Sequence, residues 1–240
     1  MLAVLMQRSL IPVEKIKLCN IPAIVWGEQS DKVYLFVHGK MSSKESAEAF
    51  AQVAMEKGYQ TVSFDLPSHG ERIGENERCD IWNGMRDLAI AGDYVFANWK
   101  EVSLFGCSLG AYFCLHTYQT RNFKKCLFQS PIVDMEYLIR QMMEWFDVPE
   151  ERLAQEKEVE TPIDILSWEY YQYVKTHPIR KWNIPTDILF GGKDNLQSLT
   201  VMRTFADRFN GVLTVAENSE HPFMEKGDGI IVEEWLRENI

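Results

Sequence analysis

The chain has 240 residues and a formal net charge of −10, and 46% of its residues are hydrophobic. This length suits one sizeable domain with a well-filled core. The acidic balance argues against nucleic acid and anionic membrane surfaces as partners, because both select clustered Lys and Arg. Five cysteines without a Cys-x-x-Cys pair argue against a disulfide framework and favour a reducing, cytoplasmic location.

The first segment, Met1–Met6, is apolar but has no basic leader, and Gln7 and Arg8 interrupt it. It is therefore not expected to act as a secretion signal. No apolar run approaches the length of a membrane span.

Short apolar runs alternate with longer stretches of helical pattern along most of the chain. Val13–Leu18 and Ile21–Trp26 have no helix between them and are expected to form an antiparallel pair at one edge of a sheet. The later expected strands are apolar on both faces, as buried parallel strands are: Val33–Val37, Thr61–Phe64, Val102–Phe105, Cys126–Gln129, Ile188–Phe190 and Val212–Val215. The expected helices are Lys44–Lys57, Asp80–Trp99, Leu109–Gln119, Leu196–Phe209 and Ile230–Asn239. This alternation predicts an α/β fold, a mostly parallel eight-stranded sheet with helices on both faces. Ser42–Glu45 predicts a capping box at the start of the first helix.

One region interrupts the alternation. From Asp134 to about Trp182 the sequence has a helical pattern, many aromatic and methionine residues, and no convincing strand. A small helical cap is therefore predicted at 131–182, inserted into a single domain whose sheet core comprises 1–130 and 183–240. Most of its aromatic residues are expected to form a second small core, and a few to line a cleft, since ligand pockets have mostly apolar walls.

The pentapeptide Gly106–Gly110, with Ser108 at its centre, lies between an expected strand and an expected helix. In this context Gly-x-Ser-x-Gly is typical of a nucleophile elbow, a turn so sharp that larger side chains at the two glycines would collide. The serine hydroxyl would stand above the sheet, and the N–H of Leu109 would face a developing oxyanion. Taken alone, the pattern also suits a serine that caps a helix. Cys107 is beside the central position and is expected to be a bystander.

Polar loops follow the other expected strands, at the edge where open parallel sheets gather their functional residues. Asp194 follows Ile188–Phe190, and His221 follows Val212–Val215. Alone, the aspartate would suit a turn and the histidine an exposed loop. Together with Ser108 they predict a catalytic triad, because a serine hydroxyl needs a base, and a carboxylate fixes the tautomer of that base.

The sequence resembles the α/β-hydrolase superfamily over nearly its full length. The resemblance rests on the chain order of serine, acid and histidine and on five segments: His38–Gly39, Asp65–Gly70, Gly106–Gly110, Gly192–Asp194 and His221–Phe223. The compact size and the insertion are similar to the serine-hydrolase branch with a small cap. That branch includes carboxylesterases, monoglyceride-lipase-like enzymes and acyl thioesterases.

The resemblance implies a serine esterase or thioesterase that acts through an acyl-enzyme. The aromatic and methionine residues of the predicted cap favour a small to medium acyl substrate with a modest apolar portion. It also implies one oxyanion-hole N–H on Lys40, with Met41 as the near alternative, and a second on Leu109. His38 and His69 belong to the family's loop segments and are expected to organise loops rather than transfer protons.

Several classes of site have no counterpart in the sequence. No His, Cys and carboxylate spacing matches a zinc site, and no glycine-rich phosphate loop is present, so no metal or cofactor is expected. Two alternatives stay open: an acyltransferase or peptidase with the same triad, and a non-catalytic binding protein on the same fold. If the acid is not Asp194, Asp134 after the sixth strand is the next candidate.

Overall fold

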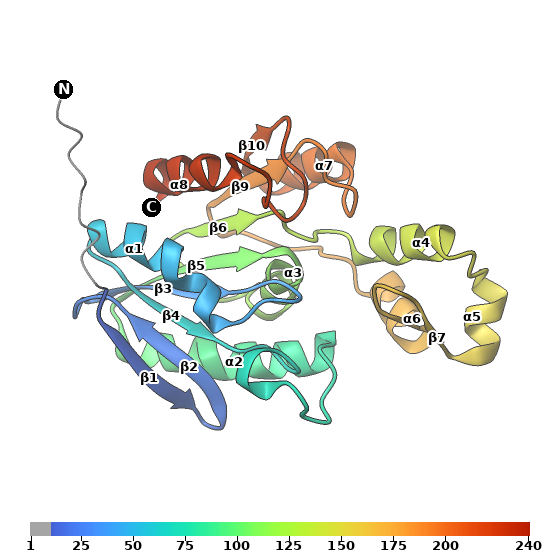
Figure 1. Ribbon diagram of the computed structural model, residues 1–240, viewed down its shortest axis with the longest axis horizontal. Coiled ribbons are helices and arrows are strands. Elements are labelled where there is room, and N and C mark those ends of the chain that lie inside the picture. Colours follow the sequence, from blue (N-terminus) through green and yellow to red (C-terminus); the bar gives the residue numbers. More distant parts are fainter. Residues whose placement is uncertain (1–10) are drawn as a thin grey trace.

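An eight-stranded sheet forms the centre of the molecule (Figure 1). The computed structural model describes residues 11–240, so the prediction made for Met1–Met6 lies outside them. The strands of the sheet are β1 (Val13–Leu18), β2 (Ile21–Trp26), β3 (Lys32–Val37), β4 (Gln60–Phe64), β5 (Glu101–Cys107), β6 (Cys126–Gln129), β9 (Thr186–Gly191) and β10 (Val212–Ala216). All eight strands expected from the sequence are therefore confirmed.

The strand order in the sheet is β1-β2-β4-β3-β5-β6-β9-β10. β2 pairs antiparallel with both β1 and β4, and the other pairings are parallel. In the register of the central strands, Leu35 of β3 lies opposite Val62 of β4 and Leu104 of β5. The predicted fold class is confirmed, including the antiparallel pair at one edge.

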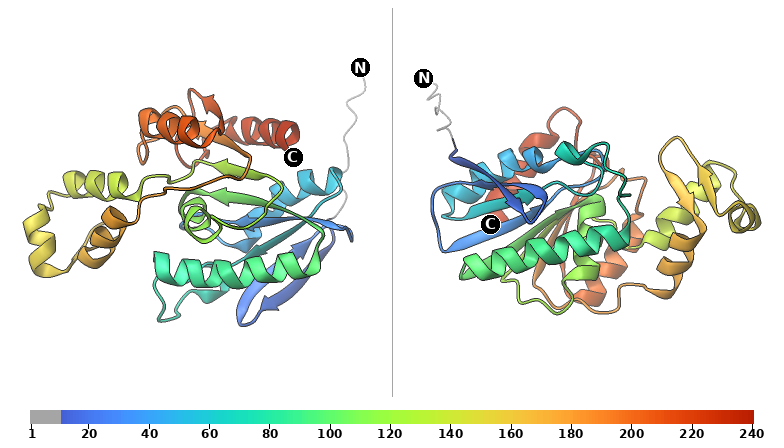
Figure 2. Two further views of the ribbon diagram at one scale, coloured as in Figure 1. Left: turned by 180° about the vertical axis from the view of Figure 1, so that it is seen from behind. Right: turned by 90° about the horizontal axis from the view of Figure 1, so that it is seen from below.

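Helices cover both faces of the sheet (Figure 2). They are α1 (Glu48–Glu56), α2 (Ile81–Asn98), α3 (Ser108–Thr117), α7 (Leu199–Phe209) and α8 (Asp228–Asn239), with short 3₁₀ turns at Lys44–Ala47 and Gly70–Arg72. Apolar residues of α2, α3 and α7 share one buried cluster with one face of the strands, and those of α1 and α8 share the other. Within residues 11–240, no helix combines the length and the apolar character needed to cross a bilayer.

The insertion between β6 and β9 projects beyond the end of the sheet toward which the parallel strands run (Figure 1). It contains α4 (Met135–Trp145), α5 (Glu150–Glu156), β7 (Glu158–Glu160), β8 (Ile165–Ser167) and α6 (Trp168–Thr176). The expectation that this region has no strand is wrong, because β7 and β8 form an antiparallel hairpin. Each strand has only three residues, which is too short for an alternating pattern to be recognised.

The predicted capping box at the start of the first helix is also wrong. Ser43 is the N-cap residue, but its side chain makes no capping hydrogen bond. Its hydroxyl donates instead to Glu45 Oε2 at 2.7 Å.

Candidate active site

Ser108 occupies a sharp turn between β5 and α3. Its φ is +48°, in the left-handed region that L-residues adopt at a cost and that is common at functional turns. A Cβ placed on Gly110 would lie 2.3 Å from the carbonyl oxygen of His38, and one placed on Gly106 would lie 3.0 Å from Ala111 Cα. The turn can therefore be this tight only because both flanking positions are glycine.

The turn brings Ser108 to the two other residues of the predicted triad. Ser108 Oγ lies 2.8 Å from His221 Nε2, and His221 Nδ1 lies 2.7 Å from Asp194 Oδ2. A neutral imidazole with its proton on Nδ1 satisfies both contacts: it donates to the carboxylate and accepts from the serine hydroxyl. The side chain of His221 is 12% exposed and that of Asp194 fully buried, so the carboxylate meets the imidazole out of contact with water.

The backbone that follows β9 fixes the carboxylate of Asp194. Its Oδ1 accepts the N–H groups of Leu196 at 2.8 Å and Gln197 at 3.1 Å, which leaves Oδ2 to the histidine. The two glycines before it allow the acid loop to pack directly on the histidine loop. A Cβ on Gly191 would lie 2.6 Å from the carbonyl oxygen of Ser219, and one on Gly192 equally close to a backbone carbonyl of the same loop.

Ser130, which directly follows β6, supports the histidine loop and was not singled out from the sequence. It is fully buried, and its hydroxyl donates to the carbonyl oxygen of His221 at 2.7 Å. The only feature of the sequence that could have pointed to Ser130 was its position directly after a strand. Asp134, the alternative acid, caps α4 instead, where its Oδ1 accepts the N–H of Tyr137.

The loop after β3 runs against the elbow. A Cβ on Gly39 would lie 3.1 Å from Ser108 Cβ, so the backbone at Gly39 borders the serine. Leu109 is the second residue of α3, and its N–H is among the first four that have no acceptor within a helix. The N–H of Met41 donates to His69 Nε2 at 3.1 Å, so it is already engaged.

His38 and His69 connect the loops around the site. The N–H of Leu66 donates to His38 Nε2 at 3.1 Å, and His38 Nδ1 lies 2.7 Å from the carbonyl oxygen of Gly39. His69 repeats the arrangement between the N–H of Met41 and the carbonyl oxygen of Pro67. Burial lowers the pKa of His38 to about 4, so this ring stays neutral at physiological pH and serves as a link between loops.

Cys107 has the properties of an unreactive thiol. Burial raises its pKa to about 12, which leaves it protonated at neutral pH, and the thiolate is the nucleophilic form. Among residues 11–240, no group of three or more His, Cys and carboxylate side chains is arranged to hold a metal ion.

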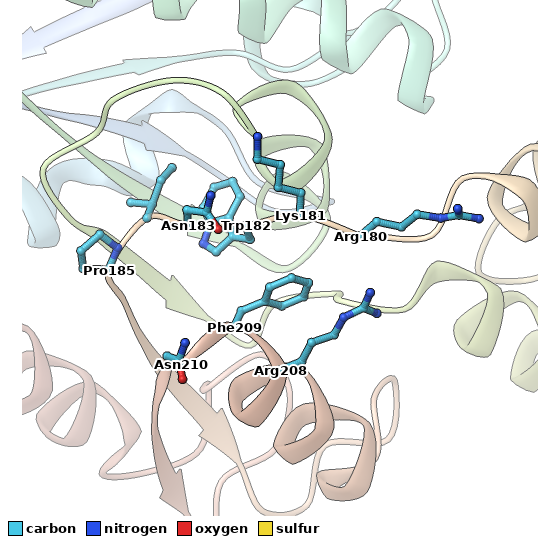
Figure 3. A pocket seen from close by; sticks show the side chains of 9 residues that line it. Arg180, Lys181, Trp182, Asn183, Pro185, Arg208, Phe209 and Asn210 are labelled. Atoms are coloured by element: carbon cyan, nitrogen blue, oxygen red, sulfur yellow. The ribbon is translucent and has the colours of Figure 1, made fainter.

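Figure 3 shows a surface depression of about 570 Å³. Ile184 and Pro185 in its lining directly precede β9, whereas Asp194 follows that strand, so the depression belongs to the opposite edge of the sheet. The charged ends of its basic residues extend separately rather than toward one point: Arg180, Lys181 and Arg208 (Figure 3).

Solved structures with this architecture are numerous, although their sequences are distant. Alpha/beta hydrolase domain-containing protein 10 from mouse has a TM-score of 0.74 at 16% identity, over 95% of this chain and 97% of that one. A putative hydrolase from Agrobacterium vitis S4 has a TM-score of 0.74 at 17% identity, over 96% and 99% of the two chains. Est1E from Butyrivibrio proteoclasticus has a TM-score of 0.71 at 15% identity, over 94% and 96%. The chain therefore has the α/β-hydrolase fold. No protein-family model matches the sequence, and comparison with curated protein sequences gives no match.

Proposed function

We propose that this protein is a serine hydrolase that cleaves a carboxylic ester or thioester of a small to medium acyl group. The observation that carries the proposal is the continuous hydrogen-bonded series from Ser108 Oγ through His221 to Asp194, with distances of 2.8 and 2.7 Å. Such a series is what a hydroxyl needs to become a nucleophile near neutral pH. The fold shared with the putative hydrolase from Agrobacterium vitis S4 is consistent with this chemistry.

In the acylation step, Ser108 Oγ attacks the carbonyl carbon while His221 Nε2 takes the hydroxyl proton. The imidazolium that forms is stabilised by Asp194 Oδ2, which already accepts a hydrogen bond from Nδ1. His221 then gives the proton to the leaving alcohol or thiol, and an ester bond to Ser108 remains.

The charge that develops on the carbonyl oxygen needs donors held in place before the reaction. The backbone N–H groups of Leu109 and Lys40 are our candidates. The first lies at the start of α3, and the second lies on the loop that borders Ser108. Met41 is the weaker candidate, because its N–H is bonded to His69.

In deacylation, His221 takes a proton from water as the water oxygen attacks the acyl carbon. His221 then returns the proton to Ser108 Oγ as the bond between Oγ and the acyl carbon breaks and the acid leaves. No metal or cofactor takes part in this proposal. The free state of all five cysteines fits a reducing, cytoplasmic location.

The insertion is the proposed source of substrate selectivity. Trp82 of α2 contacts Tyr170 and Tyr173 of α6, with ring centroids 5.9 and 5.4 Å apart, so aromatic groups gather where the insertion meets the body. An acyl group with a modest apolar portion suits such walls. One solved structure of Est1E has ferulic acid bound, so an arylacyl ester belongs among the substrates to be tested.

A fluorophosphonate probe with peptide mass spectrometry tests the proposal. We expect Ser108 to be labelled in the folded protein and no label in Ser108→Ala. Absence of label on folded wild-type protein would refute the enzyme proposal and favour a binding protein. A panel of esters, thioesters and amides, each with and without a competing alcohol acceptor, then separates a hydrolase from a peptidase and an acyltransferase.

A further inference from the structure

The side chain of Lys40 joins the loop beside Ser108 to the insertion. Lys40 Nζ donates to the carbonyl oxygen of Ile163 at 3.2 Å and forms an ion pair with Asp164 Oδ2. These partners are more than 120 residues away in sequence, at the turn of the β7–β8 hairpin. A residue whose backbone N–H is a candidate oxyanion donor is thus held through its side chain by another part of the fold.

The hairpin turn presents both acceptors in a fixed orientation. The N–H of Thr161 donates to the carbonyl oxygen of Asp164 at 3.0 Å, and the Thr161 hydroxyl accepts the N–H of Asp164 at 3.1 Å. Asp164 Oδ1 accepts the N–H of Ile165 at 2.9 Å, which directs Oδ2 to Lys40. The carboxylate is therefore oriented by its own turn.

A second contact holds the hairpin on the body of the protein. Arg78, from the segment between β4 and α2, pairs with both carboxylate oxygens of Glu158 in β7, one of them at 2.9 Å. Bidentate pairs of this kind add geometric definition as well as energy. Of these two ion pairs between the hairpin and the body, only one involves Lys40.

The other contacts of the loop fix the backbone on either side of Lys40 but not the orientation of its own N–H. Gly39 is confined against Ser108, and Met41 is tied to His69 and has a φ of +62°, in the left-handed region. Between these fixed neighbours, the direction of the Lys40 N–H depends on the peptide plane between residues 39 and 40. The anchored side chain restricts that rotation.

We propose that Asp164 is a positioning residue, which orients the Lys40 N–H toward the oxyanion through the Lys40 side chain. This role rests on the function proposed above. The Lys40–Asp164 pair is partly solvated, with side-chain exposures of 35% and 54%, so its effect on global stability is small. The pair instead affects how the Lys40 N–H is aligned with the oxyanion in the transition state. A single oxyanion donor contributes roughly 100- to 1,000-fold to kcat.

Asp164→Asn tests this role, because it keeps the shape and the Oδ1 acceptor while it removes the charge that holds Lys40. We expect kcat to fall about 10-fold with KM changed less than about 2-fold, as a partly misdirected donor predicts. Lys40→Met should give a similar loss, and the double variant should lose no more than either single variant. Raising salt to about 1 M should lower kcat of the wild type but not of Asp164→Asn, because salt screens the pair.

Two control variants separate this role from general effects. Asp31→Asn removes a more exposed surface pair, Asp31 with Lys100 at 2.7 Å, next to the opposite ends of β3 and β5. Glu158→Gln weakens the other attachment of the hairpin and leaves the Lys40 contact in place. We expect kcat of both to stay within about 2-fold of the wild type.

Amide hydrogen exchange of the peptide covering residues 38–43 gives a readout that does not need catalysis. We expect faster exchange in Asp164→Asn and wild-type rates in Asp31→Asn. Unchanged kcat and unchanged exchange in Asp164→Asn, with an active wild type, would overturn the positioning role and leave the hydrolase proposal intact. A wild-type protein without turnover or Ser108 label would instead overturn both, since there would be no oxyanion to stabilise.

Discussion

Gly110→Ala tests the geometric basis of the elbow. The new Cβ would lie 2.3 Å from the carbonyl oxygen of His38, 2.8 Å from that of Val37 and 2.9 Å from Val37 Cγ1. Two of these three atoms belong to the backbone of β3 and the loop after it, so the clash cannot be relieved by a side-chain rotation. Either α3 or the loop that borders Ser108 must move.

The expected cost follows from two opposing effects. Alanine is better than glycine within a helix by up to about 1 kcal/mol, whereas overpacking at a rigid position costs about 1–3 kcal/mol, occasionally more. We expect a net loss of about 2 kcal/mol in the free energy of unfolding. Gly229→Ala is the matched control. That glycine is in α8, and no atom lies within 4 Å of its added Cβ, so this change should stabilise the protein by up to about 1 kcal/mol.

Urea unfolding followed by tryptophan fluorescence gives both free energies, and fluorophosphonate labelling gives the reactivity of Ser108. We expect Gly110→Ala to unfold at lower urea with an unchanged m-value, and its labelling rate to fall at least about 10-fold through displacement of the loop that borders Ser108. A Gly110→Ala protein as stable and as reactive as the wild type would refute the geometric explanation.

Three further predictions concern single side chains. Asp194→Asn should lower kcat for an activated ester about 10⁴-fold, because the histidine loses its required tautomer; a value within tenfold of the wild type would place the acid elsewhere. Burial lowers the pKa of His38 to about 4 from an ordinary value near 6.5. At this site the unfolded chain therefore binds more protons between these values, so the contribution of His38 to the free energy of unfolding should fall by up to about 3 kcal/mol as pH falls from about 6.5 to about 4. Urea titrations across this range should show a weaker pH dependence in His38→Gln, and an equal dependence would contradict the assignment. Because burial raises the pKa of Cys107 to about 12, Cys107→Ala should keep the wild-type kcat. Iodoacetamide at neutral pH should modify exposed Cys19 well before Cys107, and the reverse order in intact protein would contradict this.

The inner strands of the sheet were predictable from the sequence because they are buried on both faces, unlike the edge strands β1 and β10. Runs such as Val33–Val37 are continuously apolar, and a parallel strand between two helical layers requires that pattern. Cys126–Gln129 has the same bounds in the prediction and in the structure. Since such strands end at one edge of the sheet, the location of Asp194 and His221 at that edge could also be predicted.

Features that depend on long-range contacts were not predictable. The β7–β8 hairpin has strands of three residues, and both glutamates of Glu158–Glu160 are exposed. Nothing local in the sequence relates Lys40 to Asp164, or Ser130 to the carbonyl oxygen of His221. The capping box is also absent: Ser43 makes no capping hydrogen bond, and its hydroxyl donates to the side chain of Glu45.

The most direct test of the central claim is mass spectrometry of the protein quenched with acid during turnover of an activated ester. The proposed mechanism predicts an acyl group on the peptide that contains Ser108, and none in Ser108→Ala. It also predicts far slower formation of this adduct in His221→Ala, because the hydroxyl then lacks its base. Turnover with Ser108 unmodified, or with the acyl group on Cys107, would contradict the assignment of Ser108 as the nucleophile.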